Sequence, residues 1–440
     1  MGDPLSVAIG AVELALAAGA TEADATSTVA QRFSTEARDA TVVKLEQSTG
    51  RSLTLRAFVA GSKATLTTTD LSPDGLRDAV RRVVEAARHV ESDALAGLPE
   101  PAEPPPEGPL QLYFDDVGAR SPEAKIADAL ALEATARAYD PRIVNSGGSR
   151  AGDTIATITL ANSRGFRGSY RTSSVLRATS PIAQDGPNKR NASYGSAARS
   201  FADLETVDAV ATIAAERAVG MCGARKPATA RLPVIFERDV AGAVLGDVFA
   251  AVNAANVAIG NSFLANRVGE RVGSELVTIV DDGLLARGLG TSPFDAEGVP
   301  TRNTVVFEGG TLRTFLFDTY YGRKLGSATT ANASGGGIGP NNFYLRPGTR
   351  SVQELVASTP RGVLVLDTIG FATEYVTGTY SRGARGYMIE GGELAYPIDE
   401  FTIAGNLATM LEGIDAVADD LRFDGAIIAP SFRVAEMTIG

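Results

Sequence analysis

The sequence predicts an α+β protein in two parts: an N-terminal α/β domain with a possible internal duplication and a C-terminal, mainly antiparallel β domain with a few helices. Three observations predict this class. Helical and strand patterns alternate in residues 1–225, strand patterns dominate residues 226–440, and 440 residues exceed the usual size of a single domain.

The first copy of the N-terminal pattern begins with a helix at about residues 4–18. Strands are predicted at 41–50 and 51–69, where short alternating apolar runs lie between glycine turns. A second helix begins at Ser72, a predicted N-cap, with Pro73 in its first turn. One face of this helix is apolar and carries Leu76, Val80, Val83, Val84 and Ala87.

The second copy repeats this order over a longer stretch. A Ser-Pro pair opens a helix at 121–139, strands follow through 156–174, and an amphipathic helix is predicted at about 204–219. Between the copies, the proline-rich segment 99–109 favours an extended, semi-rigid connector.

Strand patterns fill most of the C-terminal domain. They lie at 232–237, 275–282, 303–318, 362–370, 386–405 and 431–440. Glycine pairs at 309–310 and 391–392 mark two hairpins. Helices are predicted near 239–255, 351–358 and 406–417. Ser351 and Glu354 have capping-box spacing at the second of these helices.

Composition excludes several functional classes. The chain has 52 acidic and 41 basic residues, a net charge of −11, and no polybasic run, which disfavours a nucleic-acid partner. No apolar stretch approaches the roughly 20 residues that span a bilayer. The first 20 residues lack a basic n-region, and Glu13 interrupts their apolar run. We therefore expect a cytoplasmic protein without a membrane partner.

Metal-binding and nucleophilic side chains are scarce. Cys222 is the single cysteine and His89 the single histidine, so no intramolecular disulfide or thiol-imidazole cluster can form. Without a histidine base, Cys222 is better interpreted as a structural thiol, and His89 as a residue near a helix C-terminus. Asp281 and Asp282 could form a paired acid site, although a strand running into a turn is the favoured interpretation.

The segment SGGGIGPNNFYLRPG, residues 334–348, indicates a close approach of two backbones. Gly335, Gly336 and Gly337 leave room for a peptide strand, and the side-chain amides of Asn341 and Asn342 could bond to its backbone. A tight internal turn with locally capping asparagines is the alternative. Nucleotide binding is disfavoured, because a proline and an extended segment follow where a helix would be needed.

A second group of polar residues lies in GTYSRGARG. Tyr380, Ser381 and Arg382 could form a corner that binds a carboxylate or an oxyanion, and a turn with a solvated arginine is the alternative. No histidine is near to activate Ser381, which argues against an autonomous serine hydrolase.

Together, residues 236–283, 290–326, 334–348 and 378–407 resemble the TldD/PmbA family, in the family's order. The N-terminal half fits more loosely, through its element order and the LSPDGLRDAV helix. Older names call the family a modulator of DNA gyrase, but the acidic composition does not support direct DNA binding.

The resemblance also indicates which kind of subunit this is. TldD-type chains carry an HExxxH metal motif, but here Gly246 and Ala251 stand at the histidine positions and Asp247 at the glutamate. No cysteine follows Cys222 to supply the remaining ligand. The chain is therefore similar to the TldE (PmbA) type.

That resemblance implies a non-catalytic subunit that helps to bind and enclose an extended peptide, with no catalytic residue and no metal of its own. Zinc or iron is expected in a TldD-type partner that forms a heterodimer with this chain. Self-association as a homodimer also remains open. Two other functions also remain open: a stand-alone specialised enzyme on the same fold, for natural-product or peptide maturation, and a homomeric peptide-binding scaffold.

Overall fold

The structure is a computed structural model, and it describes residues 3–101 and 108–440. Most of the predicted connector at 99–109 lies outside the described residues, because positions 102–107 do not belong to them. The α+β class is confirmed, with a strand-rich C-terminal part. Among the described residues, no helix is both long and apolar enough to cross a membrane.

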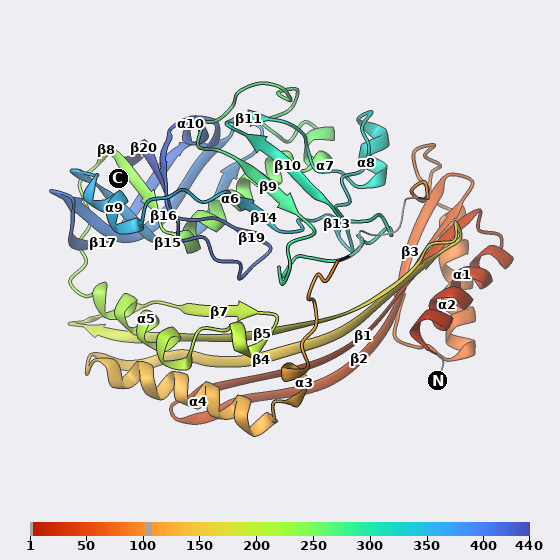
Figure 1. Cartoon of the computed structure of the whole chain (residues 1–440), viewed down its shortest axis with the longest axis horizontal. Coiled ribbons are helices and arrows are strands. Elements are labelled where there is room, and N and C mark those ends of the chain that lie inside the picture. Colours follow the sequence, from red (N-terminus) through yellow and green to blue (C-terminus); the bar gives the residue numbers. More distant parts are fainter. Residues whose placement is uncertain (1–2, 102–107) are drawn as a thin grey trace.

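One long, curved sheet forms the base of the molecule (Figure 1). Its strand order is β3-β2-β1-β4-β5-β6, and β7 also pairs with β5. The strands are β1 (Glu22–Arg38), β2 (Thr41–Val59), β3 (Ser62–Thr68), β4 (Ile143–Asn162), β5 (Arg167–Asp185), β6 (Asn188–Asn191) and β7 (Tyr194–Ala198). The central strands β1 and β4 are antiparallel and come from different copies of the sequence pattern, so the two copies meet at this pair.

Each copy begins and ends with a helix, as predicted. The helices of the N-terminal half are α1 (Pro4–Ala17), α2 (Pro73–Arg88), the short α3 (Asp115–Ala119), α4 (Pro122–Tyr139) and α5 (Val207–Gly220). Ser72 caps α2 by accepting a hydrogen bond from the Gly75 amide, and Ser121 caps α4 through the Ala124 amide. Both caps confirm the sequence prediction.

Alternation along β1 separates the two faces of the sheet. Ala23 packs with α1 and α2, and Phe33 lies under Lys125 of α4, with the Lys125 Nζ 5.0 Å from the ring centroid. Asp24 and Thr26, at even positions, point to the opposite face. Helices therefore cover one face of the sheet, and the C-terminal half lies over the other (Figure 1).

Two further sheets and a hairpin build the C-terminal half. One sheet has the order β17-β16-β15-β8-β20-β18, with strands β8 (Ala230–Phe236), β15 (Arg361–Glu374), β16 (Thr379–Glu390), β17 (Glu393–Asn406), β18 (Ile414–Val417) and β20 (Phe432–Ile439). The other has the order β11-β10-β9-β14-β19, with strands β9 (Ile279–Asp282), β10 (Asn303–Glu308), β11 (Thr311–Leu312), β14 (Phe343–Leu345) and β19 (Ile427–Ile428). Strands β12 (Ala333–Ser334) and β13 (Gly337–Ile338) pair only with each other.

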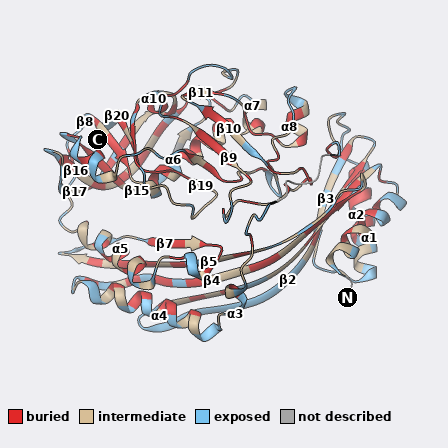
Figure 2. Cartoon of the chain, in the orientation of Figure 1, coloured by how far each residue is buried: buried red, intermediate tan, exposed pale blue. Residues whose placement is uncertain are grey.

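The helix α6 (Arg238–Val252) is the central element of the C-terminal core and contacts β14, β15 and β19. The remaining helices are α7 (Ala254–Ala258), α8 (Thr319–Lys324), α9 (Val352–Ala357) and α10 (Leu407–Glu412). The predicted capping box of Ser351 and Glu354 is present at α9. Figure 2 shows buried residues gathered in the C-terminal strands and exposed residues along β2.

Candidate functional site

The helix α6 carries the positions at which the family resemblance places the metal motif. Asp247 is 4% exposed and Ala251 is fully buried, because both lie on the side of the helix that faces the core. Gly246 is only partly buried, and a Cβ atom added there would meet no atom within 4 Å. A larger side chain would therefore fit at position 246, so the missing ligand is not explained by lack of space.

Asp247 forms a buried ion pair with Arg382. Its Oδ2 accepts a hydrogen bond from the Arg382 Nη2 at 2.7 Å, and its Oδ1 accepts one from the Tyr375 hydroxyl at 3.1 Å. Burial raises the pKa of Asp247, although Arg382 and Tyr375 act in the opposite direction. The carboxylate is thus engaged by internal partners.

The strand β16 presents Tyr380 and Arg382 to α6 and turns Ser381 away. Side chains alternate along a strand, and Tyr380 and Arg382 are buried while Ser381 between them is only partly so. The Arg382 guanidinium carbon lies 5.4 Å from the Tyr380 ring centroid. The Tyr380 hydroxyl is buried without a hydrogen-bond partner among the described residues, and burial raises its pKa. Of the predicted corner, the structure brings Tyr380 and Arg382 together with Asp247.

These residues do not fit a zinc or iron ion. Both metals select imidazole and thiolate ligands, whereas α6 offers a glycine, an alanine and an ion-paired aspartate. Across residues 3–101 and 108–440, no three His, Cys, Asp or Glu side chains are placed to hold a metal ion.

The glycine-rich segment forms an exposed hairpin, β12–β13, which we call the glycine hairpin (residues 333–338). Added Cβ atoms at Gly335, Gly336 and Gly337 would meet nothing within 4 Å. Gly337 has a φ of +123°, a conformation that favours glycine. The Ser334 hydroxyl donates to the Gly337 carbonyl at 2.9 Å and closes the turn. The hairpin tip is therefore open to an approaching backbone.

The two asparagines after the hairpin differ from the expectation, because their amides serve internal bonds. The Asn341 Nδ2 donates to Asp281 Oδ2 at 2.9 Å and to the Ala331 carbonyl at 3.3 Å. The Asn342 Nδ2 donates to the Asp282 carbonyl at 2.6 Å and to Thr291 Oγ1 at 2.8 Å. Both residues are buried, so their amide donors anchor the hairpin. For these two positions the structure agrees with the alternative of an internal turn.

Of the cavities between the N-terminal and C-terminal halves, two border the predicted site residues. One, of about 260 Å³, lies at the glycine hairpin and is lined by Thr26 and Tyr170 from the sheet and by Ser334 and Asn341 from the other side. The second, of about 420 Å³, we call the arginine pocket. Its charged lining residues are Arg217, Asp239, Asp367, Arg382 and Arg385.

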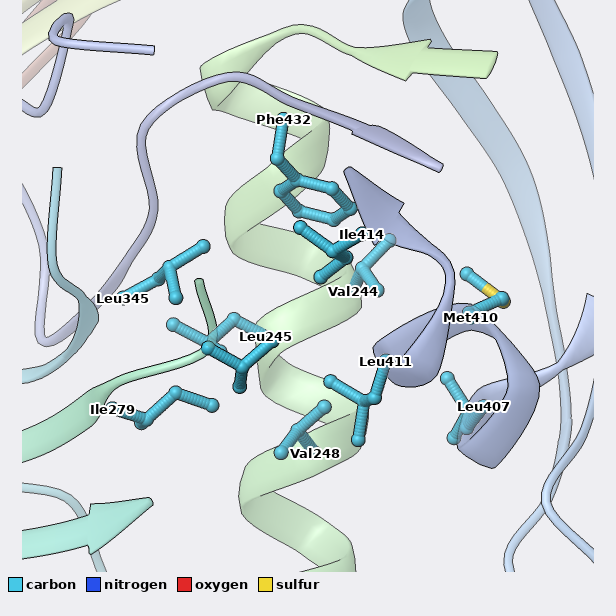
Figure 3. A pocket seen from close by; sticks show the side chains of 11 residues that line it. Val244, Leu245, Val248, Ile279, Leu345, Leu407, Met410, Leu411, Ile414 and Phe432 are labelled. Atoms are coloured by element: carbon cyan, nitrogen blue, oxygen red, sulfur yellow. The ribbon is translucent and has the colours of Figure 1, made fainter. Parts of the chain in front are cut away.

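A third cavity is a packing gap within the C-terminal core (Figure 3). It measures about 20 Å³ and is lined only by apolar side chains of α6, α10 and the nearby strands. A space that holds about one water but offers no polar partner stays dry. It lies beside Val244, Leu245 and Val248 of α6 and carries no ligand chemistry.

The remaining polar candidates have structural environments. Asp282 accepts a hydrogen bond from the Leu284 amide at 2.9 Å, which agrees with the favoured turn, but Asp281 is fully buried and anchors Asn332 and Asn341. His89 is the C-cap of α2 and its Nε2 lies 3.1 Å from Glu85 Oε1. Burial raises the pKa of the Cys222 thiol, which makes it less reactive.

Two residues that contribute to these sites could not be identified from the sequence. Tyr375 lies in a turn and reaches Asp247 across 128 positions of the chain. Asp295 accepts a hydrogen bond from the Ala333 amide at 3.1 Å and so holds the first strand of the glycine hairpin. Neither residue belongs to a spaced motif, because each acts through a contact made only in the folded chain.

Comparison with known proteins gives three family-model matches: PmbA/TldA metallopeptidase domain 1 at residues 24–87, the central domain at 115–221 and the C-terminal domain at 229–440. The metalloprotease PmbA homolog of Haemophilus influenzae is 32% identical, over 98% of this chain and 94% of that protein.

Two solved structures are similar over nearly their whole length. One, from Bacteroides thetaiotaomicron and labelled a modulator of DNA gyrase, has a TM-score of 0.93 at 25% identity and covers 99% of this chain and 98% of its own. TldE from Thermococcus kodakarensis has a TM-score of 0.89 at 20% identity, covering 98% and 99% of the two chains, and shows the fold alone.

Proposed function

The chain belongs to the PmbA/TldD family, and from this premise we propose that it is a non-catalytic, TldE-like subunit of a heteromeric metallopeptidase. In this proposal a TldD-type chain supplies the metal, and the present chain helps to bind and enclose an extended peptide. The observation that carries the proposal is the buried Asp247–Arg382 ion pair at the motif helix.

The ion pair supports this function for an energetic reason. Removing either partner of a buried pair leaves an uncompensated charge, which typically destabilises a protein by about 3–5 kcal/mol. Asp247 therefore cannot turn to a metal without abandoning Arg382, whose side chain is only 9% exposed. The glycine hairpin and the cavity beside it provide the surface for the peptide, because a backbone can approach Gly335–Gly337 without meeting a side chain.

The test is to purify the chain alone and together with a family member that carries the HExxxH motif. We expect the chain alone to hold no stoichiometric zinc or iron and to leave an unstructured peptide intact. The two chains should co-purify, with metal and peptide turnover in the complex. About one tightly held metal per chain, together with turnover by the chain alone, would overturn the proposal.

An Asp247→Asn variant provides the matched control. It keeps the shape of the side chain but removes the negative charge that a metal ligand would need. Once a melting curve shows that the variant folds, we expect the complex that contains it to keep its metal content. Loss of metal from that complex would show that Asp247 takes part in the metal site.

A further inference from the structure

Among the arginines of the arginine pocket, Arg382 makes the fewest hydrogen bonds and has a buried Nε without a partner. Arg385 bonds Asp367 and Asn191, and Arg217 bonds Glu237 and Asp239. Arg382 makes a single hydrogen bond, from its Nη2 to Asp247. In the described part of the chain its buried Nε has no partner, and no hydrogen bond reaches its Nη1.

An unsatisfied polar group in a desolvated position carries a free-energy cost. Arg120, Arg238 and Arg422 also have a buried Nε without a partner among the described residues, but of these four arginines it is Arg382 that lines the arginine pocket. Arg382 is 9% exposed and lines a pocket of about 420 Å³ between α5 and β6 of the N-terminal half and α6, β15 and β16 of the C-terminal half. A ligand that entered this pocket could satisfy the spare N–H groups after a small rotation of the guanidinium.

We propose that the arginine pocket binds a carboxylate group of the peptide, with Arg382 as the side chain that receives it. This inference rests on the proposed function, because it takes the ligand to be a peptide. A carboxylate matches the donors of a guanidinium in both charge and geometry, and such charge-assisted bonds are about twice as strong as neutral ones. The carboxylate belongs either to the C-terminus of the peptide or to an acidic side chain.

Asp247 competes with the ligand for the same guanidinium. It neutralises Arg382 in the free protein and holds one of the Arg382 nitrogens at 2.7 Å. Removing the Asp247 charge should therefore strengthen carboxylate binding, whereas removing the Arg382 charge should abolish it. A purely structural ion pair would not give these opposite effects, because both substitutions would then act only on stability.

The probes are an N-terminally fluorescein-labelled pentaalanine with a free C-terminus, its C-terminal amide, and the amide with one central glutamate. Binding is measured by fluorescence anisotropy with the full chain, alone and in its complex. We expect a probe with a carboxylate to bind about tenfold more tightly than the plain amide, equivalent to about 1.4 kcal/mol. Tighter binding of the probe with a free C-terminus identifies the C-terminal carboxylate as the ligand group. Tighter binding of the amide with a central glutamate identifies an acidic side chain.

Three variants complete the experiment. Arg382→Gln should lose the carboxylate preference, and Asp247→Asn should increase it by several-fold. Arg385 lines the same pocket but is already bonded to Asp367 and Asn191, so Arg385→Gln should keep the preference. If Arg382→Gln does not fold, the Asp247→Asn variant and the amide comparison still decide the matter.

Equal binding of all three probes to the wild-type chain would overturn this inference and leave the proposed peptide-binding function standing. Retention of the preference in Arg382→Gln would also overturn it. Failure of every probe to bind, both to the chain alone and to the complex, would reject the proposed peptide-binding function as well.

Discussion

Two buried carboxylates hold the ends of the glycine hairpin. Asp281 accepts hydrogen bonds from the Asn341 amide nitrogen at 2.8 Å and from the Asn332 Nδ2 at 2.7 Å, and Asp295 accepts one from the Ala333 amide. Burial raises the pKa of Asp281 to about 6. Burial, together with the nearby Glu297 carboxylate, raises the pKa of Asp295 to about 7.

These raised pKa values predict a pH-dependent stability. An aspartate has a pKa of about 3.9 in the unfolded chain, so between about pH 4 and pH 7 the folded state binds more protons than the unfolded state. The stability that these groups contribute is present at low pH and is lost as the pH rises through about 6 to 7. The side chain of Asp295→Asn does not ionise. We therefore expect the free energy of unfolding of this variant to fall less than that of the wild type as the pH rises from 5 to 8.

Urea unfolding at the two pH values measures this difference. Asp78→Asn is the control, because that carboxylate is 50% exposed, and this variant should follow the pH dependence of the wild type. An Asp295→Asn variant that also runs parallel to the wild type would show that Asp295 does not titrate in this range.

At the scale of elements, the tip of the glycine hairpin is open, whereas its base is close-packed. An added Cβ at Gly336 meets no atom within 4 Å, whereas one at Gly290 would lie 1.8 Å from the Asn341 carbonyl oxygen. The two glycines therefore have different roles: Gly336 keeps a surface clear, and Gly290 permits two backbone segments to pack.

We expect Gly336→Val to melt like the wild type but to lower peptide turnover in the complex by at least about fivefold, the effect of losing one hydrogen bond of about 1 kcal/mol. Gly290→Ala should instead destabilise the fold by about 1–3 kcal/mol, because close-packed backbone cannot move aside freely. Melting curves and turnover rates measure the two effects. Wild-type turnover by a folded, assembled Gly336→Val complex would show that the hairpin tip does not contact the peptide.

Local sequence signals predicted those elements whose cause is local. The caps at Ser72, Ser121 and Ser351 and the glycine-pair hairpins depend on neighbouring residues, and all were predicted. The strand β1 was missed, because its sequence EADATSTVAQRFSTEAR is rich in alanine, serine and threonine and alternates only weakly. Its pairing with β2 and β4 makes it a strand.

The candidate site was predictable to a similar extent. Asp247 and Arg382 were each singled out, but their ion pair joins positions 135 residues apart and could not be read from spacing. The roles of Asn341 and Asn342 depended on Asp281, Asp282 and Thr291, which reach them only in the folded chain. A sequence shows which side chains are available, whereas the partner that satisfies each one is set by packing.

At the scale of the whole molecule, arginines join the N-terminal half to the C-terminal half. Arg199 donates to the Gly288 carbonyl at 2.7 Å, Arg422 to Glu205 at 2.7 Å, and Arg323 to the Leu98 carbonyl at 2.6 Å. None of these three arginines lines the cavity at the glycine hairpin or the arginine pocket, so these contacts join the halves at other places.

Arg56 provides the most direct test of this arrangement. From β2 it bonds Asp24 of β1 at 2.6 Å and, across the gap, the Ala296 carbonyl at 3.1 Å and Glu297 at 3.5 Å. The side chains of Asp24 and Glu297 are 3% and 9% exposed, so Arg56→Met would leave two buried carboxylates without their cation.

We expect Arg56→Met to lose about 3–5 kcal/mol in the free energy of unfolding at pH 8, measured in urea. The loss should shrink at pH 5, because burial raises the pKa of Asp24 and protonation of this carboxylate removes an uncompensated charge. Arg77→Met is the matched control: its ion pair with Asp74 is exposed, so it should change the free energy of unfolding by less than about 1 kcal/mol. If Arg56→Met were no more destabilising than Arg77→Met, the two halves would be held together by contacts other than this arginine.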